Sequence, residues 1–211
     1  MLTTQALTAN EARVIAALIE KERTTPDLYP LSLNALTAAC NQKTSRDPVM
    51  CLSESDVQAT LESLRERELV IDSYGASGRV LRYSHRFTKT YRVPSAAVSL
   101  LASLMLRGPQ TINELRANCE RLYAFADASS VEAYLEELAQ RQDGALVIKQ
   151  PRQAGAREQR WAHLLCGEIS PPVNKAKEPI DSKKESELEA RVTQLEAEVR
   201  ELQALVKAIY D

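Results

Sequence analysis

The chain has 211 residues, of which 44% are apolar and 27% charged, with a formal net charge of −2; this is the composition of a globular protein. Its pI near 5.9 lies well below the value of about 9 typical of domains that coat nucleic acid. The chain has no apolar run long enough to span a membrane and no basic N-terminal lead with a cleavage site, so we expect a cytoplasmic protein without a membrane partner.

An internal repeat organises the sequence. Residues 33–41 (LNALTAACN) match residues 112–120 (INELRANCE), with the cysteines Cys40 and Cys119 aligned. Three further blocks recur in the same order at nearly the same offset: 61–64 at 135–138, 69–71 at 146–148 and 78–85 at 156–163. Four ordered matches predict two copies of one module of about 80 residues.

Each copy carries the same sequence of local signals. In the first copy these predict a helix opened by the capping box 8–11, a helix over 32–40, a helix over 54–68 opened by the capping box 53–56, and strands over 69–71 and 80–84. In the second they predict a helix over 96–107 ended by Gly108-Pro109, a helix capped by Thr111, a helix opened by Ser129-x-x-Glu132, and strands over 145–149 and 159–164. Three helices followed by a hairpin are typical of a winged helix.

The first copy has five extra residues between its second and third helices, in the segment NQKTSRDPVM (41–50). This segment, together with NALTAAC before it and RVLRYSHRF after it, resembles the YceH-like family of uncharacterised bacterial proteins, and the resemblance covers most of the chain. It implies a tandem winged-helix protein of bacteria whose biochemical role is not established.

The tail contains a heptad pattern. Residues 168–181 hold three prolines and predict a flexible linker. Beyond them, apolar residues recur at alternating spacings of four and three: Leu188, Val192, Leu195, Val199, Leu202, Val206 and Ile209. Valine at a and leucine at d favour a parallel two-stranded coiled coil, so the tail predicts a homodimer. The alternative is that this helix packs on the protein's own body.

The predicted third helices are acidic. Residues 54–68 carry five acidic and two basic side chains, and the third helix of the second copy is similarly acidic. Because attraction to phosphates supplies most non-specific affinity for DNA, such helices are poorly suited to lie in a DNA groove.

The predicted wings are basic. No acidic residue occurs from Ser73 to Asn113, whereas this stretch holds six arginines and lysines, including Arg92 and Arg107. The candidates for nucleic-acid contact are Lys43, Arg46, Arg79, Arg82, Arg86, Lys89, Arg157 and Arg160. The alternative is structural: Arg79 and Arg157, like Arg82 and Arg160, occupy equivalent repeat positions and could pair with acids on the third helices. Tyr83 and Trp161 are predicted to be core residues.

The remaining polar residues suggest no chemistry. The four cysteines form no C-x-x-C pair and are interpreted as reduced, small buried side chains; a zinc site of Cys40, Cys51 and His85 is the alternative. His85 and His163 end matching strands, which favours a role in the fold. No catalytic motif is present, so we expect no enzyme, no metal and no cofactor.

The sequence therefore predicts an α+β chain, mainly α with small β-hairpins. It would consist of winged-helix domains over 1–94 and 95–167, a linker over 168–181 and a coiled-coil helix over 182–211. The first hypothesis is a non-catalytic dimer that contacts double-stranded DNA in a regulatory or chromosome-associated role. The second is a scaffold that binds protein partners and no nucleic acid.

Overall fold

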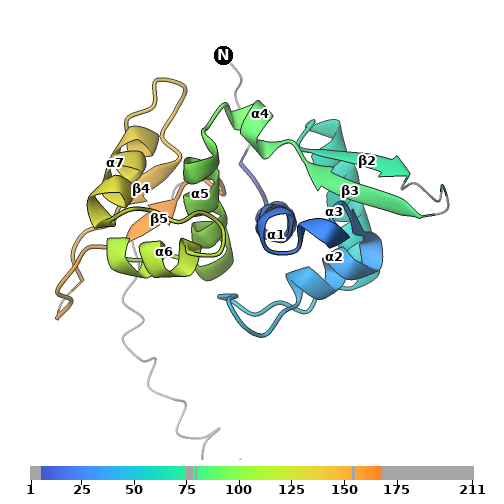
Figure 1. Cartoon of the computed structure of the whole chain (residues 1–211), viewed down its shortest axis with the longest axis horizontal. Coiled ribbons are helices and arrows are strands. Elements are labelled where there is room, and N and C mark those ends of the chain that lie inside the picture. Colours follow the sequence, from blue (N-terminus) through green and yellow to red (C-terminus); the bar gives the residue numbers. More distant parts are fainter. Residues whose placement is uncertain (1–5, 75–77, 79, 154, 168–211) are drawn as a thin grey trace, which may run out of the picture. The chain divides into compact units, whose positions relative to one another are not determined.

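The computed structural model describes residues 6–74, 78, 80–153 and 155–167 (Figure 1). The candidate Arg79 lies outside the described residues, and so do the predicted linker and C-terminal helix, including the whole heptad from Leu188 to Ile209. The described chain consists of helices and small antiparallel sheets, which confirms the α+β class.

Module one comprises residues 6–94. Its elements, in chain order, are α1 (Ala9–Thr24), the 3-10 helix η1 (Pro26–Leu28), β1 (Leu31–Ser32), α2 (Leu33–Cys40), α3 (Glu54–Glu66), β2 (Val70–Tyr74), β3 (Leu81–His85) and α4 (Phe87–Tyr91). The strands form one antiparallel sheet of order β1-β3-β2. The predicted hairpin is present, but β2 continues to Tyr74 instead of ending at residue 71. Strand β1 and helix α4 were not predicted, because elements of two and five residues are too short to show a periodic pattern.

Module two comprises residues 95–167. Its elements are α5 (Ser95–Arg107), α6 (Ile112–Cys119), α7 (Ala128–Ala139), β4 (Val147–Lys149) and β5 (Trp161–His163). Strands β4 and β5 form an antiparallel pair, and each is shorter than the strand predicted from the sequence.

Three of the predicted helix caps are confirmed. The side chains of Thr8, Ser53 and Thr111 each accept a hydrogen bond from the backbone N–H three residues later. The predicted start of the third helix in module two was wrong: α7 begins at Ala128, and Asp127 caps it by accepting the N–H of Ser130 at 2.7 Å. Ser129-x-x-Glu132 has the residue spacing of a capping box, but an aspartate two residues earlier satisfies the same kind of free N–H group.

The two modules share backbone register. Two pairings of module one recur at the repeat-equivalent positions of module two: Leu31–Tyr83 as the bridge Gln110–Trp161, and Val70–His85 as Val147–His163. Both aromatic residues are buried, as predicted, with 3% exposure for Tyr83 and for Trp161. The internal repeat is therefore visible in strand pairing as well as in sequence.

The first helices of the two modules pack against each other. Helices α1 and α5 lie side by side (Figure 1) and form the most extensive packing between any two elements of the described chain. Many of their buried residues are small, among them Ala12, Ala16, Ala97, Ala102 and Ser103. A single hydrophobic core runs through both modules, so α1 and α5 form its shared centre.

Candidate nucleic-acid interface

The exposed surface of the third helices is acidic. Glu54, Glu62 and Glu66 are exposed on α3, and the Arg65 guanidinium of that helix is paired with Asp72 of β2 at 2.9 Å. On α7, Glu136 and Glu137 are exposed. A DNA groove would meet carboxylates on both helices, so these helices are unsuited to groove binding.

Arg82 and Arg160 hold the bases of the two hairpins. Arg82 Nη1 donates to the carbonyl oxygen of Pro30 at 2.8 Å, and Arg160 Nη1 donates to that of Pro109, also at 2.8 Å. Because Pro30 and Pro109 are repeat-equivalent, both hairpins are attached in the same way to the segment that precedes the second helix. This supports the structural alternative for these two candidates.

Arg160 makes a further ion pair that Arg82 lacks. Its two terminal nitrogens lie 2.8 and 2.9 Å from the carboxylate oxygens of Glu114. Glu114 belongs to α6, the second helix, so the expected pairing of this arginine with acids on a third helix was wrong. Burial raises the pKa of Glu114, but hydrogen bonds from the Thr111 N–H and Arg160 outweigh it and hold the pKa below its usual value. Glu114 therefore meets the guanidinium as a carboxylate at neutral pH.

Arg46 is not available for the nucleic-acid contact that the sequence suggested. Its side chain has 0% exposure and lies 2.6 Å from the Glu20 carboxylate, and its guanidinium also donates to the Ala39 carbonyl oxygen at 2.9 Å. A buried guanidinium with these partners cannot reach a nucleic acid. Lys43, in the same loop, is exposed.

The connection between the modules gathers exposed cations. In α4 the rings of Phe87 and Tyr91 stack at 4.3 Å and are buried, which turns the remaining side chains outward. Lys89 and Arg92 are exposed and Arg86 is half-buried. No side-chain hydrogen bond or ion pair occupies these three cations among the described residues. They are therefore available to a phosphate. Arg92 was counted in the basic stretch of the sequence but was not a candidate for nucleic-acid contact. Helix α4, which was not predicted, places it at the end of the helix that carries Lys89 and begins after Arg86.

The candidate Arg157 lies in the loop between β4 and β5 and is exposed. Its backbone carbonyl accepts a hydrogen bond from Arg152, which also donates to the Ala156 carbonyl at 2.9 Å. Arg152 thus shapes the loop, while the side chain of Arg157 faces solvent beside the exposed Glu158.

The two matching histidines are placed inside the fold. His85 Nδ1 accepts the N–H of Phe87 at 3.3 Å, so the ring is assigned an Nε2–H that donates to Glu22 at 3.2 Å. His163 is largely buried, and burial lowers its pKa to about 4. His85 joins α1 to the start of α4, while His163 stays neutral at physiological pH.

The cysteines divide into two pairs. Cys40 and Cys119, the repeat-equivalent pair, are buried, and burial raises the pKa of each thiol to about 12. Cys51 and Cys166 are exposed, so the expectation that all four are buried was wrong for these two. Within the described ranges, no three His, Cys, Asp or Glu side chains come together as a metal site.

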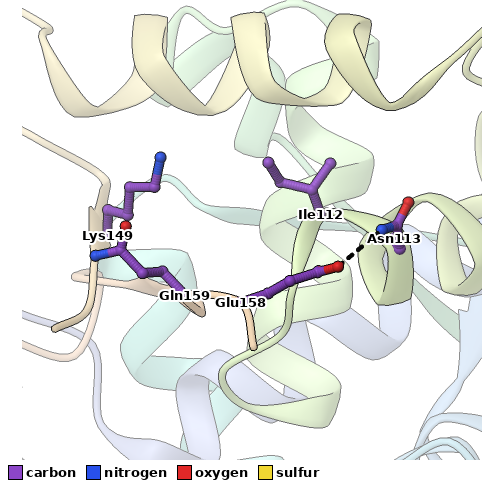
Figure 2. Close-up of a pocket in the computed structure, with 5 residues that line it drawn as sticks. All are labelled: Ile112, Asn113, Lys149, Glu158 and Gln159. Atoms are coloured by element: carbon purple, nitrogen blue, oxygen red, sulfur yellow. Dashed lines mark hydrogen bonds between the residues drawn. The ribbon is translucent and has the colours of Figure 1, made fainter. Parts of the chain in front are cut away.

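A hollow of about 310 Å³ lies where α6 approaches the second hairpin (Figure 2). It is lined by Ile112, Asn113, Lys149, Glu158 and Gln159. Glu158 accepts a hydrogen bond from Asn113 at 3.3 Å, and Lys149 lies 3.3 Å from Glu132 of α7 and 5.4 Å from the centre of the Trp161 ring. Each of the two charged groups at the hollow thus has a protein partner, a carboxylate for Lys149 and an amide for Glu158.

These features define an α+β protein of two repeated modules in which three cations without a side-chain partner among the described residues gather on the connection between the modules. The chain belongs to the DUF480 family, described as a protein of unknown function, whose family model matches residues 7–156. This confirms the family resemblance drawn from the sequence. In the described part of the chain, no helix combines the length and apolar character needed to cross a membrane.

Close relatives carry the name UPF0502 protein. One from Acidovorax sp. (strain JS42) is 58% identical over 169 residues, which cover 79% of this chain and 74% of the relative. One from Dechloromonas aromatica is 56% identical over 166 residues, covering 79% and 77%, and one from Leptothrix cholodnii is 55% identical over 166 residues, covering 79% and 73%. The similarity is to bacterial proteins whose names state no activity.

Proposed function

We propose that the chain is a non-catalytic, cytoplasmic protein of two tandem winged helices that binds the phosphate backbone of double-stranded DNA. Its role would be regulatory or chromosome-associated. The winged-helix assignment is supported by the order of three helices and a hairpin in each module and by their shared strand register.

The observation that carries the proposal is the set of accessible cations around α4. Arg86, Lys89 and Arg92 lie on or next to one short helix, and their side chains make no hydrogen bond or ion pair among the described residues. Cations without an internal partner attract an anionic backbone. Arginine and lysine without internal partners release counterions when they bind phosphates, which is the main source of non-specific DNA affinity.

Two further candidates lie in other loops of the chain, between α2 and α3 and between β4 and β5. Lys43 and Arg157 are exposed and have no side-chain partner among the described residues. Arg82 and Arg160 contribute through position, because they hold the hairpins in place. In this arrangement the protein contacts only the phosphates of the DNA backbone, which gives affinity without reading the base sequence.

A comparison of two double variants tests the proposal. Lys89→Ala/Arg92→Ala removes two exposed cations beside α4, and Arg116→Ala/Arg121→Ala removes two exposed cations from module two. Binding of a fluorescent duplex is followed by anisotropy at about 50 mM salt. We expect the α4 variant to lose affinity and to reduce the salt slope by about 2, while the control stays close to the wild type. Equal losses in both variants would overturn the assignment to α4.

A second candidate function is a scaffold for protein partners. It is favoured by the apolar side chains that the hairpins expose: Ile71 at 45%, Val80 at 49% and Ile148, the repeat equivalent of Ile71, at 44%. Exposed apolar groups beside acidic helices suit a protein partner better than DNA. Absence of duplex binding even at about 50 mM salt would favour the scaffold.

We also propose that residues 182–211 pair two chains. The heptad from Leu188 to Ile209 supports this, since an amphipathic helix of this length must cover its apolar stripe. A dimer would present two copies of the α4 cations to one duplex and raise its apparent affinity.

A further inference from the structure

The loop that distinguishes module one from module two is anchored by two buried arginines. This loop (residues 41–52) lies within module one, directly after α2. We call it the inter-module loop because it also contacts module two. Arg13 of α1 donates to the carbonyl oxygens of Cys40 at 3.1 Å and Pro48 at 2.6 Å. Arg46 projects in the opposite sense, from the loop back to α1, where it makes two hydrogen bonds to Glu20, at 3.1 and 2.6 Å. The loop is thereby fixed to α1 from both sides.

The charge balance of this anchor gives the loop one conformation. Arg13 and Arg46 are both buried, at 2% and 6% exposure. Glu20 accepts hydrogen bonds from Arg46, whereas Arg13 donates to the backbone carbonyl oxygens of Cys40 and Pro48. The remaining neutralisation comes from the carbonyl oxygens of Ala39 and Cys40, at the negative end of α2. Arg13 Nε has no hydrogen-bond partner among the described residues, so the carbonyl oxygens of Cys40 and Pro48 are what its terminal nitrogens depend on. A loop conformation that withdrew Pro48 would leave this buried charge with fewer partners.

The outer turn of the loop reaches module two. The Asp47 N–H donates to the carbonyl oxygen of Leu106 at 2.7 Å, in the last turn of α5, where carbonyls have no partner within the helix. Arg107 Nη2 lies 2.6 Å from Ser45 Oγ. Both contacts hold the C-terminal end of α5, and both come from the residues that flank Arg46 in the chain.

Several contacts join the two modules. The buried side chains of α1 and α5 combine alanines and serines with large aliphatic residues. The Leu7 N–H donates to the Leu165 carbonyl oxygen at 2.7 Å, and Arg141 donates to the Tyr91 carbonyl oxygen at 2.9 Å. The loop adds contacts at the C-terminal end of α5, where they restrain a shift of α5 along α1.

We propose that the inter-module loop is a clasp that sets the placement of module two on module one, with Arg46 as its positioning residue. Breaking the contacts at Ser45 and Asp47 lets α5 shift along α1 while both modules stay folded. This inference does not rest on DNA binding, and its test involves no nucleic acid.

The test measures the distance between the modules. Spin labels are attached at Ala59→Cys on α3 and Ala133→Cys on α7, both exposed positions, in a Cys51→Ser/Cys166→Ser background. Cys40 and Cys119 are buried, with thiol pKa values near 12, and remain unlabelled. Pulsed electron paramagnetic resonance is expected to give one narrow distance for the intact clasp and a broader distribution for Ser45→Ala/Arg107→Ala and for Arg46→Lys. An unchanged distribution in all of these variants would overturn the proposal.

Hydrogen exchange separates release of the clasp from unfolding. In Arg107→Ala, which leaves no buried charge unpaired, the Asp47 amide is expected to exchange at least roughly tenfold faster, while amides within α3 and α7 keep their rates. Arg116→Ala is the control, because Arg116, like Arg107, donates one side-chain hydrogen bond, but its acceptor is the Ala126 carbonyl oxygen inside module two. Faster exchange throughout module one in Arg107→Ala, or no change at Asp47, would contradict the clasp.

Discussion

Arg82 and Arg160 make the same hydrogen bond in the two modules. Each donates Nη1 to a proline carbonyl oxygen, Pro30 for Arg82 and Pro109 for Arg160, and both distances are 2.8 Å. The sequence aligned these arginines and left open whether they bind DNA or hold the fold. Their contacts assign them to the fold, since an arginine that fastens a hairpin is equally needed in both copies.

Replacing Arg82 is expected to destabilise the protein. Hydrogen bonds to charged groups contribute about 1.5–3 kcal/mol, and because Arg82 is only half-buried, we expect Arg82→Ala to lower the free energy of unfolding by about 1–2 kcal/mol. The exposed Arg157 is the control, with an expected change within about 0.5 kcal/mol for Arg157→Ala. Urea denaturation followed by fluorescence of the single tryptophan, Trp161, measures both. Equal stability of the two variants would refute the anchoring role.

A pair of alanine variants tests the start of α7. Asp127 accepts the Ser130 N–H, whereas Ser129 lies inside the helix and is exposed. Loss of an N-cap costs about 1 kcal/mol, so Asp127→Ala should be destabilised by that amount and Ser129→Ala by a few tenths at most. Thermal denaturation compares them. A larger loss for Ser129→Ala would restore the start that the sequence predicted.

Lowering the pH is expected to reduce the free energy of unfolding, because His163 is neutral in the folded protein. Burial lowers the pKa of this ring from 6.5 to about 4, so between these values the unfolded chain binds a proton that the folded chain does not. The free energy of unfolding therefore falls as the pH drops from 6.5 to 4, and the contribution is complete above 6.5. At 1.36 kcal/mol per pH unit, the loss at pH 5 is about 2 kcal/mol.

Denaturant titrations at pH 7 and pH 5 measure this loss, and His163→Gln is the control that removes the titrating ring. We expect the variant to show a much smaller difference between the two pH values. Glu11 and Glu114, whose pKa values are held below the usual carboxylate value of 4.5, contribute stability that is lost only at lower pH. A pH 5 loss of the same size in His163→Gln would assign the effect to other groups.

Deletion of residues 182–211 tests the proposed dimer. The apolar heptad of this segment is expected to pair between chains, so the full chain should have the mass of two protomers in light scattering and the truncated chain the mass of one. A full-length monomer would instead favour the tail packing on its own body.

The sequence predicted most of the fold because its signals are local. Capping residues such as Thr8 and Thr111 define helix starts within four positions, and the repeat transfers each assignment from one copy to the other. Strand β1 and helix α4 were not predicted because their stability comes from tertiary contacts: β1 pairs with β3, and α4 buries Phe87 and Tyr91.

The candidate site was predicted less well than the fold. The sequence does not show whether a basic residue binds a phosphate or a protein carbonyl oxygen, because its protein partners lie far away along the chain. Arg46 meets Glu20, 26 positions earlier, and Arg82 meets Pro30, 52 positions earlier. The absence of acids from Ser73 to Asn113 marks a basic stretch in the sequence, and α4 lies within it.

The most direct test of the proposed function is the salt dependence of duplex binding by the full chain. If Arg86, Lys89 and Arg92 contact phosphates, a plot of log affinity against log salt should be linear with a slope of about −3 or steeper for one chain. Tight binding with a flat salt dependence, or no binding at about 50 mM salt, would contradict the account.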